Sequence, residues 1–235
     1  MDFAEKVAVI AGATGGLGKI VTQELAQQGA RLVLLGRSQD KLESLVDELG
    51  LADREPMLFA GSLHQPGTLN ETAKTVMDTY GRIDLLLNLV GGWTGGQSLE
   101  EVPADTVQNM IDQHLWTTFY LTQAFIPSLK QTSSGRVIVV SSPTATQPGA
   151  KTAPYAIGKA AQEALMLTLA KELEGSGATA NVIQVKAIDT DRRRESDTTG
   201  KYADWTTPEE ICAAILYLCS EQAKVINGVR IPMTG

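Results

Sequence analysis

The chain contains Gly12-Ala13-Thr14-Gly15-Gly16-Leu17-Gly18 directly after a strand-like run at 6–11 and directly before a helical pattern that continues to Gln28. Glycines at a strand-to-helix turn let phosphate oxygens approach the N–H groups at the start of the helix, where the helix dipole favours an anion. An ordinary glycine-rich turn has the same composition. The position after the first strand of a long alternating series favours a dinucleotide pyrophosphate site.

Outward from this turn, short apolar runs alternate with longer helical patterns along the whole chain, which is typical of βαβ units and a parallel sheet. Consecutive apolar residues, such as Val137-Ile138-Val139-Val140, indicate strands covered by helices on both faces. The sequence predicts one α/β domain over residues 1–235, with a mobile loop beside the site near 186–207. The expected strands are 6–11, 31–35, 57–60, 83–89, 136–141, 179–185 and 229–231, and the expected helices are 16–28, 39–49, 67–80, 104–130, 154–173 and 208–220.

The composition limits the class of function. Of the 235 residues, 43% are hydrophobic and 20% are charged, which excludes collagen, coiled coil and disorder. A formal net charge of −7 disfavours nucleic acid and anionic membranes as partners, and no apolar run approaches the ~18 residues that cross a bilayer. Cys212 and Cys219 lie seven apart on one predicted helix, too far apart to bridge. We therefore expect buried thiols, no export signal and a cytoplasmic protein.

The end of the second predicted strand, Leu35-Gly36-Arg37-Ser38, bears on the choice of nucleotide. An NAD site usually places Asp or Glu here, bound to the ribose 2′-hydroxyl, and this chain has neither. The guanidinium of Arg37 can instead form a charge-assisted hydrogen bond with a 2′-phosphate. We predict NADP(H) as the preferred cofactor; NAD(H) is the alternative if Arg37 is simply a solvated residue at a helix start.

Tyr155 and Lys159 lie four residues apart near the start of a predicted helix, so their side chains share one face. Ser142 directly follows the strand predicted at 136–141, where a second polar group can reach the same substrate oxygen. A free tyrosine has a pKa of ~10 and is a poor acid or base at neutral pH, but a nearby ammonium favours the phenolate and lowers that pKa. The three residues therefore predict proton exchange with a substrate.

Several motifs resemble, in order and spacing, those of the short-chain dehydrogenase/reductase family: Gly12 to Gly18, Asn88 to Gly91, Ser142, Tyr155-Ala156-Ile157-Gly158-Lys159 and Asn227-Gly228. The resemblance covers nearly the whole chain. It implies a Rossmann fold with a seven-stranded parallel sheet, in the order 3-2-1-4-5-6-7, and a homotetramer or homodimer. It also implies that Tyr155 exchanges a proton with the substrate oxygen, that Ser142 hydrogen-bonds that oxygen, and that Lys159 binds the nicotinamide ribose.

Some positions depart from the family pattern. The usual Asn-Asn-Ala-Gly is Asn88-Leu89-Val90-Gly91, and His114 stands at the position of the family's catalytic asparagine. An imidazole can hold a water or join a proton relay, whereas a satisfied interior histidine is the alternative. The family's Pro-Gly after the sixth strand is Val185-Lys186, although Ile188 and Thr190 fall where the carboxamide of nicotinamide is contacted.

The segments 91–96, 115–117, 189–190 and 205–208 are locally similar to dihydropteridine reductase, a divergent member of the same family. Trp93 at the mouth of the site could stack on a pterin or quinone ring, or it could only pack its own loop. Arg37 and Ser142 argue against a pterin substrate, because that enzyme resembles an NADH type and lacks the serine.

The sequence thus predicts an NADP(H)-dependent oxidoreductase that transfers hydride between nicotinamide and a small carbonyl or alcohol substrate. Reduction of a quinonoid pterin or quinone and a catalytically weak dinucleotide-binding sensor are the alternatives. The basic run 192–194 is expected to form a solvated loop surface or to attract an acidic substrate. No cluster of possible ligands in the sequence argues for a metal site. The expected catalytic residues are Ser142, Tyr155, Lys159 and His114, and the expected substrate residues are Trp93, Ser142, Thr144 and Tyr155. The expected cofactor-binding residues are Gly12, Thr14, Gly15, Gly16, Leu17, Gly18, Arg37, Ser62, Leu63, Asn88, Val90, Gly91, Tyr155, Lys159, Ile188 and Thr190.

Overall fold

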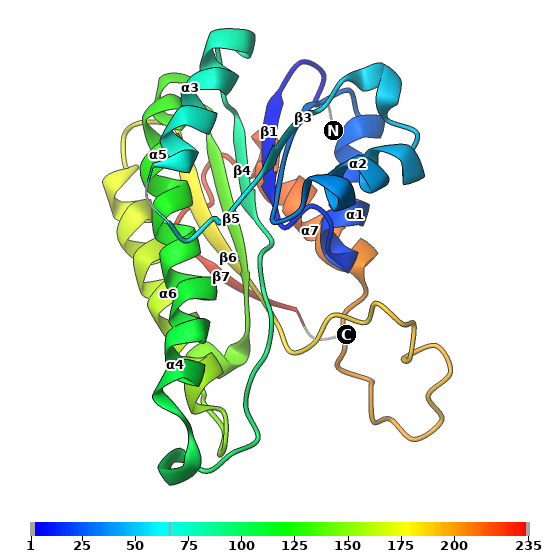
Figure 1. Ribbon diagram of the computed structural model, residues 1–235, viewed down its shortest axis with the longest axis vertical. Helices are drawn as coiled ribbons and strands as arrows, with labels where there is room; N and C mark the ends of the chain where they lie inside the picture. The colour runs from blue at the N-terminus through cyan, green and yellow to red at the C-terminus, as the bar shows by residue number, and fades with distance from the viewer. Residues whose placement is uncertain (1–2, 66, 234–235) are drawn as a thin grey trace.

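A computed structural model describes residues 3–65 and 67–233. It contains a seven-stranded parallel sheet in the order β3-β2-β1-β4-β5-β6-β7, with helices on both faces (Figure 1). The predicted α/β class and strand order are therefore confirmed. The strands are β1 (Val7–Ala11), β2 (Arg31–Gly36), β3 (Met57–Ala60), β4 (Leu85–Asn88), β5 (Arg136–Ser141), β6 (Thr179–Val185) and β7 (Arg230–Met233). The α-helices are α1 (Gly16–Gln27), α2 (Gln39–Glu48), α3 (Thr68–Tyr80), α4 (Ala104–Ile111), α5 (Thr117–Gln131), α6 (Ala153–Glu172) and α7 (Pro208–Cys219).

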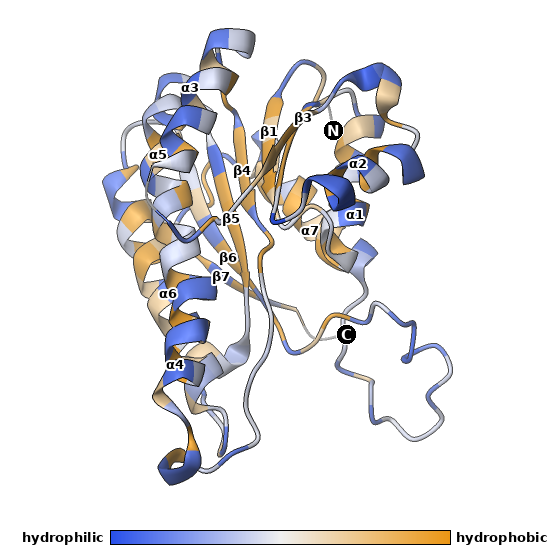
Figure 2. Cartoon of the chain, viewed as in Figure 1, coloured by the Kyte–Doolittle hydropathy of each residue, from blue (hydrophilic) through white to orange (hydrophobic). Residues whose placement is uncertain are grey.

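The sheet buries alternate residues of each strand on opposite faces, because successive side chains of a strand point to opposite sides. In β1, Ala8 and Ile10 pack in the core that includes α1, α2 and α7, whereas Val7 and Val9 pack in the core that includes α3, α5 and α6. Figure 2 shows the apolar strands between the two helix layers. A sheet covered on both faces leaves the ends of its strands as the place where loops can build a site.

The helix expected at 104–130 is interrupted. A π-helical turn, Asp112–Trp116, separates α4 from α5, and such turns are frequent at functional sites. Two hydroxyls stabilise it from inside: Thr117 Oγ1 donates to the carbonyl oxygen of Asp112 at 3.1 Å, and Thr118 Oγ1 donates to that of His114 at 2.6 Å. The hydrophobic pattern continues across the turn, so sequence periodicity does not detect it.

Two glycines of the first turn are required by close backbone contacts. Gly12 has a φ of 82°, in the left-handed region that favours glycine. A Cβ on Gly18 would lie 2.2 Å from the carbonyl oxygen of Gly12. Helix α1 therefore begins directly against the end of β1, with Gly15 as its N-cap.

The two cysteines are free and buried on α7, as expected. Burial raises the pKa of both Cys212 and Cys219 to about 12, so each thiol stays protonated and unreactive at neutral pH. Over residues 3–65 and 67–233, no helix combines the length and the apolar character needed to cross a membrane.

Candidate active site

A cavity of about 570 Å³ opens at the carboxyl ends of β1, β2 and β4. Helix α1 begins beside it with no side-chain cap, so the N–H groups of its first turn are not used by a capping side chain. Such groups suit the oxygens of a pyrophosphate, and the cavity is large enough for part of a dinucleotide. Its lining residues are Gly12, Thr14, Gly15, Gly36, Arg37, Lys41, Ser62, Leu63, His64, Leu89, Val90, Gly91, Asn109, Met110, Asp112, Gln113 and Thr117.

The remaining residues expected to bind the cofactor lie behind or beside this cavity. Leu17 and Gly18 are buried in the packing of α1, and Gly16 lies against Thr190, whose Cγ2 would be 2.6 Å from a Cβ on that glycine. Ile188 forms an isolated parallel bridge with Thr206. The segment after β6 therefore reaches back to the glycine turn, and the predicted contact of Thr190 with the nicotinamide carboxamide stays a prediction.

The end of β2 presents two cations to the cavity. Arg37 and Lys41 both line it and both are exposed, and Ser38 caps α2 by accepting a hydrogen bond from the backbone N–H of Lys41 at 3.4 Å. Within the described residues, neither cation has an ion-pair partner. Lys41 is missing from the sequence prediction, although its position one helical turn after Arg37 could have identified it.

Ser142 and Tyr155 are brought together at the carboxyl end of β5. The hydroxyl of Ser142 is hydrogen-bonded to Tyr155, and it also donates to Thr144 Oγ1 at 3.2 Å. Burial raises the pKa of Tyr155, and the hydrogen bond between Tyr155 and Ser142 opposes that rise. The phenol is therefore held in its protonated form at neutral pH.

Lys159 lies beside Tyr155 but contacts other groups. Its Nζ is 6.0 Å from the centroid of the Tyr155 ring, and it donates to the carbonyl oxygen of Val140 at 2.7 Å and to Gln162 Oε1 at 3.0 Å. Burial lowers the pKa of Lys159 to about 7. The expectation that this ammonium lowers the pKa of Tyr155 is wrong for this structure, because burial of the phenol dominates.

His114 lies on the π-helical turn and is fully buried. Its ring packs edge-on against Tyr155, with ring centroids 5.5 Å apart. A Cβ on Gly158 would be 3.0 Å from His114 Cδ2, so this glycine of α6 is what lets the turn approach. Nε2 of His114 donates to the carbonyl oxygen of Gly92 at 3.1 Å, which leaves Nδ1 as a buried acceptor with no partner among the described residues. Burial, with the nearby Lys159 charge, lowers the pKa of His114 to about 3.

Asn88 and Trp93 have contacts that differ from those expected of cofactor or substrate groups. Asn88 is buried, its Oδ1 accepts from the N–H of Val90 at 3.1 Å, and its Nδ2 donates to Thr118 Oγ1 at 2.8 Å. The ring of Trp93 lies against Gly95, close enough that a Cβ there would be 2.8 Å from the ring, and Trp93 is 62% exposed. Trp93 thus packs its own loop while one part of its ring stays open to solvent.

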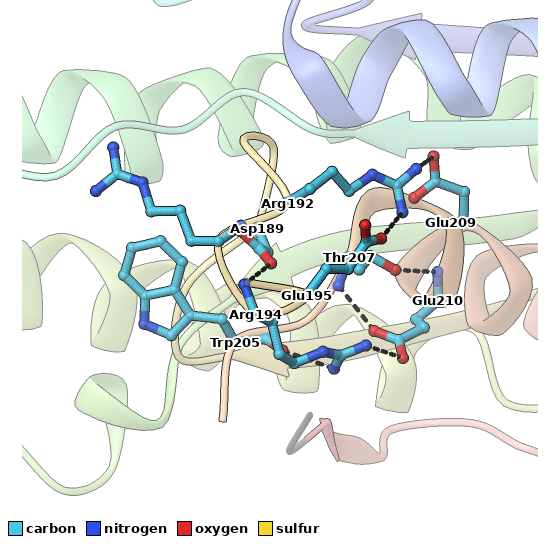
Figure 3. Close-up of polar contacts among 9 residues, drawn as sticks. Asp189, Arg192, Arg194, Glu195, Trp205, Thr207, Glu209 and Glu210 are labelled. Atoms are coloured by element: carbon cyan, nitrogen blue, oxygen red, sulfur yellow. Dashed lines mark hydrogen bonds and ion pairs between the residues drawn. The ribbon is translucent and has the colours of Figure 1, made fainter. Parts of the chain in front are cut away.

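The basic run 192–194 is not a free cationic surface. Figure 3 shows Arg192 and Arg194 extending from the loop to the start of α7, where they pair with Glu209 at 2.7 Å and Glu210 at 2.6 Å. The carboxylate of Asp189 accepts hydrogen bonds from the backbone N–H groups of Arg193 and Arg194. These pairs neutralise most of the positive charge that the sequence offered to an acidic substrate.

The glycine turn, its cavity and the Ser142–Tyr155 pair beside Lys159 define a dinucleotide-binding oxidoreductase of the Rossmann type. A family model described as short chain dehydrogenase matches residues 6–201. The chain belongs to the short-chain dehydrogenase/reductase family, whose members use nicotinamide dinucleotides. Among the described residues, no group of three His, Cys, Asp or Glu side chains could hold a metal ion.

The relatives span the full length of the chain. It is 29% identical to an uncharacterized oxidoreductase of Staphylococcus epidermidis, covering 97% of this chain and 96% of that one. It is 26% identical to the 3-oxoacyl-(acyl-carrier-protein) reductase FabG of Salmonella typhimurium, covering 100% and 98%. A crystal structure of a short chain dehydrogenase from Bacillus anthracis is 29% identical, with a TM-score of 0.87 over 98% and 95% of the chains.

Structures of lower identity share the fold and contain either coenzyme. Xylitol dehydrogenase bound to NAD⁺ is 19% identical, with a TM-score of 0.88 over 100% of both chains. The L-sorbose reductase of Gluconobacter frateurii, complexed with NADPH and L-sorbose, is 24% identical, with a TM-score of 0.85 over 100% and 97%.

The buried His114 predicts a specific loss of stability in acid. The unfolded chain binds a proton at this residue below about pH 6.5, whereas the folded protein resists it down to a pKa of about 3. Stability should therefore fall with pH across this window, by on the order of 3 kcal/mol between about pH 6.5 and about pH 4. His114→Asn should remove this part of the pH slope in urea denaturation. The exposed His64→Asn variant is the control and should keep the slope; an unchanged slope in His114→Asn would contradict the prediction.

Proposed function

We propose that this protein is an NADP(H)-dependent oxidoreductase that transfers hydride between nicotinamide and a small carbonyl or alcohol substrate. The observation that carries the proposal is the hydrogen-bonded Ser142–Tyr155 pair, with Lys159 beside it. This pair follows β5 at the same carboxyl edge of the sheet as the cavity, although none of the three residues lines the cavity. A nicotinamide coenzyme supplies the hydride chemistry when it is bound. The residues of the chain bind and orient that coenzyme and move the proton.

The residues that would hold the coenzyme suit its charges. The first turn of α1 would bind the pyrophosphate through backbone N–H groups, and the cations Arg37 and Lys41 would bind the 2′-phosphate. Ser62 and Leu63 line the cavity after β3, where they would contact the adenine. Thr190, which lies against Gly16, would contact the nicotinamide end together with Ile188.

Tyr155 would act as the proton donor. Its raised pKa keeps the phenol protonated at neutral pH, so it can give a proton to a carbonyl oxygen as hydride reaches the carbon. Ser142 would hydrogen-bond the same oxygen.

His114 contributes differently from a protonated relay group. With its pKa lowered to about 3 it stays neutral, and its unpartnered Nδ1 is an acceptor. We propose that it accepts a hydrogen bond from a water near Tyr155, which is one of the two roles that the sequence left open for this histidine. Cytoplasmic location fits the two free thiols.

An assay of NADPH oxidation with ketones, quinones and quinonoid dihydropterin also tests two alternative functions. A quinonoid pterin or quinone substrate is favoured only by the exposed part of Trp93, and a dinucleotide sensor only by the altered family positions. Turnover with quinonoid dihydropterin and not with ketones would support the first. Stoichiometric NADPH binding without turnover of ketones, quinones or dihydropterin would support the second and overturn the proposal.

The substitution Tyr155→Phe should abolish carbonyl reduction while leaving NADPH affinity within about twofold, because it removes the proton donor and keeps the ring that packs on His114. The loss should be at least ~100-fold in kcat, measured as loss of NADPH absorbance with any ketone that the unaltered protein turns over. The exposed Tyr217→Phe variant is the control. Unchanged turnover by Tyr155→Phe would remove the residue from the reaction.

Arg37→Met and Lys41→Met should each weaken NADPH binding while leaving NADH binding nearly unchanged, because only NADPH carries the 2′-phosphate. Loss of a charge-assisted hydrogen bond predicts about tenfold for Arg37→Met. Fluorescence titration measures both affinities, and Lys74→Met, on the exposed face of α3, is the matched control. Equal losses for NADH and NADPH, or tighter NADH binding by the unaltered protein, would refute the NADP(H) preference.

We also propose a homodimer or homotetramer formed through α5 and α6. The exposed Trp116, directly before α5, stacks on Tyr120 of α5, and Ile157 on α6 is 43% exposed. Light scattering should give a dimer or tetramer, and Ile157→Glu should shift it toward monomer, whereas Val225→Glu, at another exposed apolar residue, should not. A monomer before any substitution would contradict the assembly.

A further inference from the structure

A chain of buried hydrogen bonds connects the loop after β4 with the ammonium of Lys159. From the backbone N–H of Val90 it passes to Asn88 Oδ1 at 3.1 Å, and from Asn88 Nδ2 to Thr118 Oγ1 at 2.8 Å. Gln162 Nε2 donates to the same hydroxyl at 2.9 Å, and Gln162 Oε1 accepts from Lys159 Nζ at 3.0 Å. Asn88 and Gln162 lie on β4 and α6, and Thr118 on α5 joins them.

The direction of every bond in this chain follows from two backbone groups, the N–H of Val90 and the carbonyl oxygen of His114. The N–H of Val90 can only donate, so it fixes Asn88 Oδ1 as the acceptor and turns Asn88 Nδ2 toward Thr118. Thr118 has one proton, and it donates that proton to the carbonyl oxygen of His114 at 2.6 Å. Its hydroxyl oxygen therefore accepts from both Asn88 and Gln162.

The same reasoning fixes the amide of Gln162. Because Thr118 has no proton left to donate to it, Gln162 must present its NH₂ group to the hydroxyl. Its carbonyl oxygen then faces Lys159 Nζ. A flipped amide would set an NH₂ group against the ammonium and leave Thr118 without that donor, so the hydroxyl holds the glutamine in one orientation.

Few other groups in the interior can stabilise the ammonium of Lys159. Lys159 is 4% exposed, Gln162 is fully buried, and the second acceptor is the carbonyl oxygen of Val140 at 2.7 Å. The carboxylate of Glu163, which interacts with the charge of Lys159, is already bonded to Gln184 and Arg230. His114 and Tyr155, the other titratable groups that face the lysine, are neutral at neutral pH.

We propose that Gln162 is a positioning residue that holds Lys159 in the site through its carbonyl oxygen, and that the hydroxyl of Thr118 fixes the orientation of Gln162. The inference deepens the proposed function, because Lys159 is the residue assigned there beside the proton donor. The sequence pattern Tyr155 to Lys159 does not include Gln162, which follows one helical turn later.

The test measures the ionisation of Lys159 directly in the cofactor-free protein. Lysine labelled with ¹³C at the ε-carbon reports protonation by NMR, and the Lys159→Met variant identifies the signal. Gln162→Met removes the acceptor and should lower the proton affinity of Lys159 about tenfold, whereas Gln162→Glu supplies a carboxylate and should raise it about tenfold. Gln131→Met, at an exposed position of α5, is the matched control and should leave the titration unchanged.

Substitutions at Thr118, whose hydroxyl joins Asn88 and Gln162, test the same inference independently. Thr118→Val keeps the side-chain shape but loses the hydroxyl, so the amide of Gln162 is released and the proton affinity of Lys159 should fall severalfold. Thr118→Ser keeps the hydroxyl and should restore the titration. Circular dichroism of each variant verifies folding before the titration, and the two Gln162 variants decide the inference where Thr118→Val does not fold.

The outcomes separate this inference from the proposed function, because the titration uses neither coenzyme nor substrate. A Lys159 titration that stays within about twofold in Gln162→Met, Gln162→Glu and Thr118→Val overturns the positioning role, even if the enzyme reduces carbonyls. Opposite shifts in Gln162→Met and Gln162→Glu support it, even if no substrate is turned over.

Discussion

Burial of the sheet on both faces is the constraint on which the rest of this structure depends. Alternate side chains of each strand enter two separate apolar cores, so the middle of the sheet is not open to solvent chemistry. Polar groups that must meet a ligand gather instead beyond the carboxyl ends of the strands. The glycine turn follows β1, Arg37 follows β2, and Ser142 follows β5, so residues far apart in sequence arrive at one edge.

A buried lysine at this edge carries a charge that must be stabilised, and the fold supplies hydrogen-bond acceptors for its ammonium. A buried ammonium is costly unless its N–H groups are bonded, and Lys159 meets two oxygens, from Val140 and Gln162. Those bonds offset the cost only in part, because burial still lowers the pKa of Lys159 to about 7. The phenol of Tyr155 experiences the opposite consequence of burial, a raised pKa. Burial in one pocket therefore favours the uncharged form of both groups, the amine of Lys159 and the phenol of Tyr155.

The arginines of the loop after β6 are neutralised at the surface by ion pairs. They meet the glutamates at the start of α7, where Thr207 and Glu210 form a capping box. Exposed pairs of this kind contribute little to stability, but they cancel charge beside the site. The side chain of Asp189 is fully buried and accepts hydrogen bonds from two backbone N–H groups, which fixes the loop where it leaves the sheet.

The sequence by itself determined the parallel sheet, the glycine turn, the cationic end of β2 and the serine, tyrosine and lysine, because local periodicity, glycine spacing and motif spacing carry that information. Only the tertiary structure decided what these groups contact. The π-helical turn that brings His114 to Tyr155 does not disturb the hydrophobic pattern. The acceptors of Lys159 come from β5 and from the next turn of α6, and the residue that orients Gln162 lies 44 positions away on α5. Hydrogen-bond direction and burial arise where separate elements meet, and spacing along one chain does not encode them.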